Sequence, residues 1–454
     1  MRSMISQYPS IISNQQSVIK YPFRGETFGF LTPFYLHLSP FYFAKLELNK
    51  INNIMRKVQL TILAVTFPMS YALSDGNHSA GLTSIDMALS QIESNNTTLM
   101  SYRKDMNVSQ LENKADTYPE DPEIGFNLLW GSPSEIGSRK DISVSQPIDI
   151  PTVTGKKREL ARRKDETNES EYRIERMNVL LEAKLYLIEL IYTNAMLKEL
   201  YKRKEHAATI KELMNKRLEK GDGNILDYNN SCLNVTNIEG DIRKMESEKE
   251  MIVGNLARLN GGKDIEIADT EYPEVLLPTD FEKWYAESGQ DNPLLNYEKS
   301  RIRLGHSQLD MAKSLNLPKF SVGYMSEKTV GERFQGVTIG VTVPLWGNKN
   351  RTRIAKANIE AAEARKEDVE SGLRSRQKTL FRQAKGLLST ALTYESAIHT
   401  PDNERILKKA LDYGEITIIE YMTQAAYYYD SYDKAMAARR DYMKTVAELN
   451  AYQL

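Results

Sequence analysis

A long internal repeat constrains the fold of this chain more than any other feature of its 454 residues. The segments Leu218–Tyr228 and Leu411–Tyr421 share a glycine and the apolar and acidic residues after it, 193 positions apart (414 − 221). The segments Val144–Ile148 and Val341–Leu345 are also alike, and each precedes a glycine and a basic run. Self-similarity at a fixed spacing is a signal about the whole fold. The spacing exceeds any short solenoid unit, so it predicts one large unit, a strand pair followed by a long helical hairpin, that occurs twice.

Composition excludes several classes of function. The 60 basic and 61 acidic residues nearly cancel, which argues against a nucleic-acid-binding protein held by phosphate contacts. The single cysteine, Cys232, supplies neither a disulfide nor a Cys-type zinc site, and the five histidines lack metal-ligand spacing. The sequence contains no G-x-S-x-G, H-E-x-x-H or P-loop motif. We therefore expect no enzyme activity, no cofactor and no metal site.

The start of the chain predicts export. Met55-Arg56-Lys57 precedes the apolar run Val58–Phe67 and the small residues Ala72-Leu73-Ser74, as in a secretory signal peptide over residues 55–74. Residues 1–54 are interpreted as an upstream extension, disordered or translated from a misplaced start. After residue 80 no stretch reaches about 18 consecutive apolar residues, so no transmembrane helix is expected in the main body.

Alternation with a period of two predicts one β-hairpin over residues 123–149 and a second over 319–345. Each hairpin has one apolar face and one face of small or polar residues. The apolar positions, which would face lipid if the strands span a membrane, are Ile124, Phe126, Leu128, Trp130, Ile142, Val144, Phe320, Val322, Tyr324, Val337, Ile339, Val341 and Val343.

Two explanations compete for these strands, a water-soluble sandwich and an outer-membrane barrel. Four strands of about nine residues cannot close a barrel, because spanning barrels begin at about eight strands. Open strand edges are excluded from lipid, where unpaired N–H and C=O groups find no water. The strands would therefore pair with strands of other copies, and three copies would make a 12-stranded barrel.

Long helices are predicted after each hairpin, as helical hairpins over residues 156–259 and 348–452, with Pro401 interrupting the second. Between Lys156 and Glu219 there is neither proline nor glycine, which allows a helix of about 96 Å. Leu180, Leu187 and Ile191 add a second apolar stripe, so this helix is expected to contact neighbours on two sides. Its first stripe steps by three and four as in a coiled coil: Ile174, Met177, Leu181, Leu185, Ile188, Tyr192 and Ala195.

The chain resembles the TolC-like outer-membrane efflux proteins over residues 80–454. The resemblance is carried by Val343–Arg351 with Ala355-Lys356-Ala357, by Tyr413–Tyr421 and by Ala447–Asn450. It implies a mainly α fold with a small β part. Three chains would form a transmembrane β-barrel of 12 strands, four strands per chain, on a long α-helical coiled-coil barrel. The two repeats would be residues 80–262 and 294–454, each beginning with a helix, joined by an equatorial segment at 263–293.

The resemblance also implies a function. It predicts the outer-membrane channel of a tripartite efflux system in a Gram-negative bacterium, with the helical part in the periplasm. The partners would be two further copies, a periplasmic adaptor, outer-membrane lipid and an inner-membrane transporter of the resistance-nodulation-division type. Two alternatives stay open: an outer-membrane conduit for type I secretion, and a soluble periplasmic coiled-coil scaffold or adaptor. The sequence does not identify the transported substrate.

The candidate sites lie at the turns of the helical hairpins. Common descent accounts for the similarity of the two turns, and a shared docking role is the interpretation favoured here. The resemblance assigns Glu420 to an acidic ring that narrows the periplasmic entrance, with Asp227 at the equivalent position of the first repeat. Thr423 stands where relatives have a second acid, which leaves the charge of this gate open. The predicted adaptor-docking residues are Lys220, Gly221, Asp222, Gly223, Asn224, Tyr413, Gly414, Glu415, Ile416 and Thr417.

Overall fold

The structure is a computed structural model that describes residues 84–398 and 403–454, all within one compact unit, Ala80–Leu454. The expected extension at 1–54 and signal peptide at 55–74 lie outside the described residues. This unit is mainly helical with one small antiparallel sheet, which confirms the expected fold class at that level. No helix in the described ranges combines the length and the apolar composition that crossing a membrane requires.

The first repeat opens with two helices rather than one. Asn96 separates them because its side chain accepts a hydrogen bond from the backbone N–H of Leu99, 2.9 Å away, and so caps the second helix. One helix was expected at the start of this repeat, so this part of the prediction is wrong. The elements are α2 (Ser84–Asn95), α3 (Thr97–Ala115), β1 (Glu123–Trp130), η1 (Ser134–Ile136), β2 (Ser138–Ile148), α4 (Pro151–Glu219) and α5 (Ile225–Leu259).

The second repeat follows the same order after a short connecting region. Pro401 falls between two of its helices and lies outside the described residues. The elements are α6 (Phe281–Ser288), η2 (Gly289–Asp291), α7 (Pro293–Ser314), β3 (Lys319–Lys328), β4 (Arg333–Thr342), α8 (Arg351–Ile398), α9 (Asn403–Asp412), α10 (Ile418–Leu449) and η3 (Ala451–Gln453).

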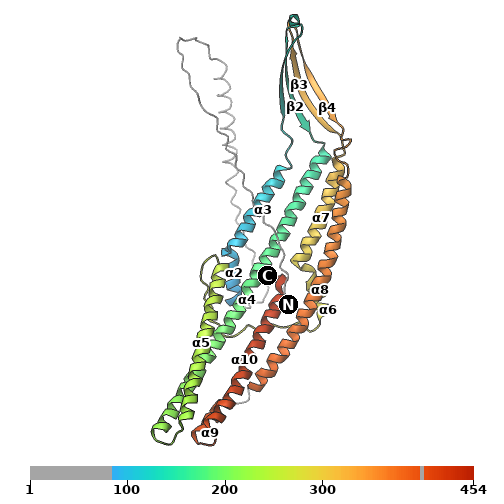
Figure 1. The fold of residues 1–454 in the computed structure, drawn as a ribbon. Coiled ribbons are helices and arrows are strands. Elements are labelled where there is room, and N and C mark those ends of the chain that lie inside the picture. Colours follow the sequence, from blue (N-terminus) through green and yellow to red (C-terminus); the bar gives the residue numbers. More distant parts are fainter. Residues whose placement is uncertain (1–83, 399–402) are drawn as a thin grey trace, which may run out of the picture. The chain divides into compact units, whose positions relative to one another are not determined.

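The strands form one antiparallel sheet in the order β1-β2-β3-β4. The two hairpins therefore join through β2 and β3, and β1 and β4 are the edge strands. The register is continuous across the sheet: Val144 lies opposite Ile124 on one side and Tyr324 on the other, and Tyr324 lies opposite Val337. Figure 1 shows these strands at one end of α4 and the α4–α5 and α9–α10 turns at its other end.

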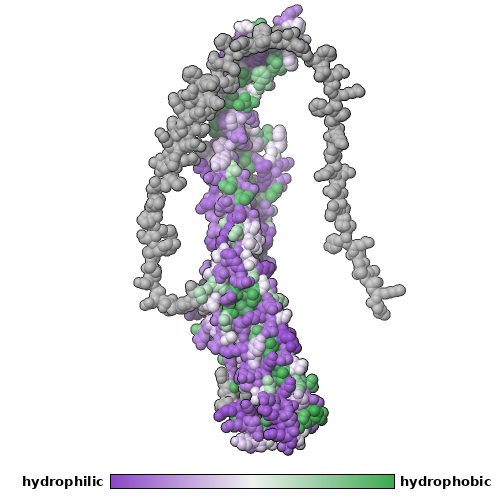
Figure 2. Space-filling view, turned by 90° about the vertical axis from the view of Figure 1, so that its left-hand side faces the viewer, coloured by the Kyte–Doolittle hydropathy of each residue, from purple (hydrophilic) through white to green (hydrophobic). Residues whose placement is uncertain are grey.

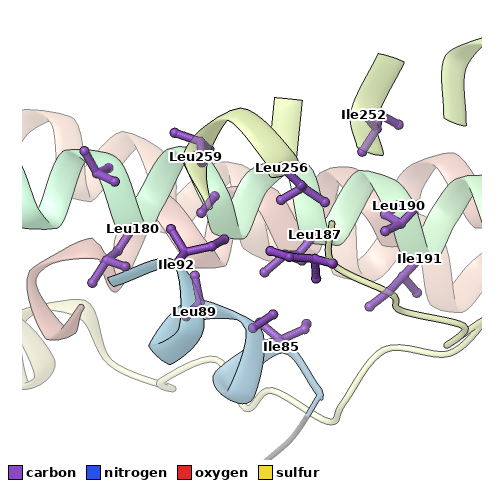
Figure 3. Close-up of a cluster of buried hydrophobic side chains, with 14 of the residues drawn as sticks. Ile85, Leu89, Ile92, Leu180, Leu187, Leu190, Ile191, Ile252, Leu256 and Leu259 are labelled. Carbon is purple, nitrogen blue, oxygen red and sulfur yellow. The ribbon is translucent and has the colours of Figure 1, made fainter. Parts of the chain in front are cut away.

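The long helix α4 contacts different neighbours on two sides, as its two apolar stripes predicted. On one side Leu180, Leu187 and Ile191 pack with side chains of α2 and α5 (Figure 3). On the other side Ile188 packs with Tyr442 of α10 and with further residues of α8 and α10. Burial of both stripes fixes α4 between α2 and α5 on one side and the second helical hairpin on the other.

The segment between α5 and α7 holds the middle part of α8 and the chain end together. Phe281 and Trp284 of α6 are buried and pack with Phe381 of α8, and Trp284 lies edge-on to Tyr452. Asp280 caps α6 by accepting hydrogen bonds from the N–H groups of its first turn. This short helix therefore joins the connecting segment to the second helical hairpin.

Candidate functional site

One face of the sheet carries the apolar side chains that the alternation singled out. Directly opposed residues of antiparallel strands project to the same face. The register aligns Ile124, Val144, Tyr324 and Val337 in one row across all four strands. All the predicted apolar positions are exposed, from 37% at Leu128 to 80% at Trp130. An exposed apolar surface of this kind marks a site of contact with a partner or a membrane.

On its half nearer the helices, the opposite face consists mainly of glycine, serine and threonine, whereas Leu129 and Phe334 lie on it nearer the hairpin turns. Glycines lie across from hydroxyl side chains: Gly125 is paired with Ser143, and Gly340 with Ser321. A Cβ atom at Gly125 would lie 2.6 Å from Ser143 Oγ, so the glycine allows the hydroxyl group to lie over the neighbouring strand. Nearer the helices, the covering of this face is therefore thin and polar.

Near the hairpin turns, the polar face carries a cluster of one basic and two acidic side chains. Asp141 and Glu327 are opposed in the register of β2 and β3. Arg139 Nε lies 2.9 Å from Asp141 Oδ1 and 2.9 Å from Glu327 Oε1. One cation between two acids relieves the repulsion that the acids would otherwise exert on each other.

Two exposed tryptophans lie at opposite ends of the sheet. Trp130 ends β1 on the side of the hairpin turns and is 80% exposed. Trp346 follows β4 on the side of α8 and is 79% exposed. Tryptophans at both ends of an apolar band are typical of proteins that contact the two interfaces of a membrane.

The two turns of the helical hairpins have the same backbone hydrogen bonds. In the first turn the N–H of Gly221 donates to Leu218 O over 3.1 Å, and that of Asp222 to Arg217 O over 3.0 Å. In the second, the corresponding donors, 193 positions later, are Gly414 and Glu415, which bond to the carbonyls of residues 411 and 410 over 3.1 and 2.8 Å. Both are Schellman motifs, which require a left-handed residue. Gly221 has φ of 78° and Gly414 has φ of 71°.

The helices after the turns begin at equivalent caps. Asn224 accepts a hydrogen bond from the N–H of Leu226 at the start of α5. Thr417 starts α10 with a capping box: its Oγ1 accepts from the N–H of Glu420 over 3.2 Å, and its own N–H donates to Glu420 Oε2 over 2.8 Å. Hydrogen bonds to Glu420 from the backbone and then the hydroxyl of Thr417 hold the pKa of Glu420 below its ordinary value.

These caps give the repeated acid a local cause. Asp227 and Glu420 both occupy the third position of a helix, where unpaired N–H groups and the helix dipole favour a carboxylate. The repetition that favoured a docking role therefore also follows from how the two helices begin. Thr423 lies one turn further along α10, and its hydroxyl donates to Ile419 O over 2.7 Å.

Behind the turns, the two helical hairpins are packed together. Ile210 and Met214 of α4 form a buried cluster with Leu411 of α9 and with Ile418 and Tyr421 of α10. At the surface the turns stay open, and the Tyr413 side chain is 79% exposed. Most of the predicted docking residues are thus exposed on a base that is well packed.

Arg203 joins α4 to α10 through a cluster that the sequence analysis did not identify. Its Nη2 lies 2.7 Å from Asp433 Oδ1 and its Nε 3.1 Å from Glu199 Oε1, and the guanidinium carbon is 4.3 Å from the ring centroid of Tyr429. Burial lowers the pKa of Arg203, but the hydrogen bonds and charges of Asp433 and Glu199 outweigh it, so the net shift is upward. The only sequence signal is the i,i+4 spacing of Glu199 and Arg203.

Close to the turns, an open groove of about 660 Å³ runs between α5 and α10. Thr423 lines it from α10, facing asparagines of α5 such as Asn230 and Asn234. On the face shown in Figure 2, the helical part is mainly hydrophilic, with hydrophobic side chains in separate patches. Of the predicted gate residues, the structure therefore places Thr423 in a groove and Glu420 in a helix cap.

No protein-family model matches the chain, and no curated protein sequence matches it. Solved structures do share its fold. The CmeC outer membrane channel of Campylobacter jejuni is 14% identical with a TM-score of 0.60, covering 81% of this chain and 85% of that one. The outer membrane protein VceC of Vibrio cholerae is 11% identical with a TM-score of 0.61, covering 81% and 95%. The open state of the Neisseria gonorrhoeae MtrE outer membrane channel is 13% identical with a TM-score of 0.59, covering 81% and 88%. At the level of the fold, the resemblance to TolC-like channels is confirmed.

Proposed function

We propose that this protein is the outer-membrane channel of a tripartite efflux system and conducts substrates passively out of the periplasm. The observation that carries the proposal is the sheet, with an exposed apolar face, a small polar face and two unpaired edges. A soluble protein would have to cover this apolar face. In an outer-membrane barrel the apolar face would contact lipid, and the polar face would line a water-filled lumen.

The edges of the sheet determine the assembly. Unpaired backbone groups are not tolerated in the hydrocarbon region, so β1 and β4 must pair with strands of other copies. Three copies of the four-stranded sheet give 12 strands, a number that closes a barrel. The shared fold with proteins described as outer-membrane channels supports this assembly and a non-enzymatic role.

The helical part would form the periplasmic conduit. Residues 80–262 and 294–454 would be two copies of one unit joined by 263–293, and the identical hydrogen bonds at the two turns support this division. The 69 residues of α4 span about 104 Å, which carries the turns far from the sheet. The exposed turns Lys220–Asn224 and Tyr413–Thr417 would dock on a periplasmic adaptor that serves an inner-membrane transporter of the resistance-nodulation-division type.

The entrance would lie at the same end of the helices. Asp227, Glu420 and Thr423 would surround it, with Glu420 fixed in its cap. Opening would require the hairpins to repack near the turns, driven by adaptor contacts that exist only in the open state.

Membrane fractionation of cells that express the full-length chain tests the proposal. The protein is expected in the outer-membrane fraction, to require detergent for extraction, and to migrate as a trimer by native mass spectrometry. The trimer should conduct ions in a planar bilayer. Recovery of a stable monomer from the soluble periplasmic fraction would sink the proposal.

A further inference from the structure

Three basic residues form a row on the apolar face of the sheet. Lys140 of β2 lies opposite Lys328 of β3, and Lys328 lies opposite Arg333 of β4. All three side chains are exposed. On β1, the partner of Lys140 is Leu128, and Phe126 lies two residues closer to the helices. By the register, the three basic side chains project to the same face as Phe126.

This row is electrostatically unfavourable by itself. Like charges directly opposed on neighbouring strands destabilise a sheet. Among the described residues, no carboxylate lies within ion-pair distance of Lys140, Lys328 or Arg333, and the polar contact of Arg333 is with Ser326 Oγ, 3.3 Å from its Nε. The opposite face of the same strands differs, since Arg139 there lies between two acids. The apolar face thus leaves three positive charges for an anion from outside the sheet.

The position of the row specifies the kind of anion. Towards the helices the face becomes apolar, through the row of Ile124, Val144, Tyr324 and Val337. Away from the helices lie the hairpin turns. Lysine and arginine at such a boundary lay their aliphatic stems along apolar surface and point their charges to the polar side. A ligand that covers both zones has hydrocarbon chains beside a negatively charged headgroup.

We propose that Lys140, Lys328 and Arg333 bind the headgroup of a membrane lipid that carries two phosphates, in the leaflet next to the hairpin turns. The proposal rests on the proposed function, which makes this the outer leaflet. Neighbouring strands lie about 4.8 Å apart, so the three charges extend over roughly 10 Å. A headgroup with two phosphates offers each outer cation a phosphate of its own, whereas a single phosphate would have to be shared by all three. The acyl chains of the lipid lie on the apolar rows below.

Lipid binding to the full-length protein in detergent tests this assignment, with native mass spectrometry as the readout. The probe is diphosphoryl lipid A, compared with the same lipid after removal of both phosphates. The variant K140Q/K328Q/R333Q removes the row. The control K244Q/R382Q/K385Q removes the same number of positive charges from exposed positions on α5 and α8.

The wild type and the control are expected to bind the phosphorylated lipid about 100-fold more tightly than the row variant, at roughly fivefold for each of the three cations. The phosphate-free lipid should bind all three proteins equally weakly. Equal affinity of the row variant and the control overturns the assignment. If the row variant fails to assemble, the comparison of the two lipids on the wild type tests the assignment. Equal affinity of the wild type for the phosphorylated and the phosphate-free lipid overturns it as well.

The proposed function fails separately. Insertion of the wild type into phosphatidylcholine vesicles, which lack lipid A, tests the barrel in the absence of the proposed ligand. If the protein inserts and conducts but does not prefer the phosphorylated lipid, only the proposal of a lipid site is overturned.

Discussion

Single residues near the turns show how local chemistry accounts for a repeated pattern. Thr417 and Glu420 satisfy each other's backbone groups at the start of α10, and Asn224 caps α5 at the equivalent place. A cap of this type fixes where a helix begins, since its first N–H groups have no partner within the helix. The direction of each helix after its turn therefore depends on a few hydrogen bonds.

Replacing Thr417 with alanine is expected to loosen the start of α10. The change removes the hydroxyl that accepts from the N–H of Glu420 and destabilises the helix end by about 1 kcal/mol. Hydrogen exchange of the peptide that covers the second turn should become faster. Thr423→Ala is the matched control, because the Thr423 hydroxyl bonds within the helix to Ile419 O. Equal exchange rates in both variants would contradict the role of the cap.

A partly buried ion pair between α2 and α4 should make stability depend on pH. Arg176 Nε and Nη2 donate to the two oxygens of Glu93 over 2.6 and 2.7 Å. The hydrogen bond from Arg176 lowers the pKa of Glu93 against the opposing effect of burial, and the charges of Arg176 and Arg103 add to the lowering. A carboxyl whose pKa is lower in the folded protein stabilises it fully above the ordinary value of 4.5 and loses this effect as pH falls below it.

Glu93→Gln is therefore expected to lower the free energy of unfolding by about 1 kcal/mol at pH 7, and by less at pH 3.5. Thermal unfolding at both pH values measures the difference. Glu212→Gln is the control, because Glu212 pairs with Lys216 only at the exposed surface of α4. A difference for Glu93→Gln that does not shrink in acid would show that the carboxylate is not the source.

At the scale of elements, the helices and strands follow from periodicity, whereas their ends depend on individual residues. The two stripes of α4 and the alternation in the strands predict elements that the structure contains. The break at Asn96 was missed because a capping asparagine interrupts an otherwise helical pattern. The helix α4 begins at Pro151, before Gly155, since proline suits the first position of a helix and the glycine lies in its first turn.

Contacts between segments far apart in the chain could not be predicted from the sequence. The Arg203–Asp433 pair joins residues 230 positions apart, and no local pattern indicates it. The row of Lys140, Lys328 and Arg333 depends on the register of three strands, two of them far apart along the chain. Spacing along one element identifies a face, but only the pairing of elements shows what lies beside it.

Gly414→Glu is expected to impair efflux and leave trimer assembly intact. A Cβ at Gly414 meets no atom within 4 Å, so the new side chain would project from the exposed turn into a docking partner. The backbone with φ of 71° adds a strain of about 1 kcal/mol. Drug or metal resistance of cells, together with the amount of trimer, measures the effect.

Gly262→Glu is the control for backbone strain without an effect on docking. Gly262 has φ of 85°, and a Cβ there likewise meets no atom within 4 Å, but it lies after α5, far from the turns. Resistance should persist in this variant. Full resistance in Gly414→Glu would count against docking at this turn.

At the scale of the whole molecule, the two faces of the sheet should respond oppositely to the same charge. Ile339 is 76% exposed on the apolar face of β4, and its neighbour Thr338 points to the polar face, opposite Gly323. Ile339→Arg would place a charge in lipid, which costs roughly 2–4 kcal/mol near the middle of a membrane. We expect little assembled trimer in outer-membrane fractions.

Thr338→Arg should assemble normally and reduce or rectify the conductance of the trimer in a planar bilayer, because the arginine would project into the lumen. The small Gly323 leaves room beside it. Equal loss of both variants from the membrane fraction would show that the two faces are not distinguished by lipid and water.

The unpaired edges of β1 and β4 also affect the behaviour of the chain before it assembles. Under the proposed function, a newly exported chain exposes to water an apolar sheet whose two unpaired edges can pair with any extended strand nearby, which is the usual starting point of misassembly. The helical hairpins can form early without a membrane, whereas the sheet would become stable only when it inserts into the membrane. Survival during transit should thus rest on a chaperone that shields residues 123–148 and 319–342 until sister subunits arrive.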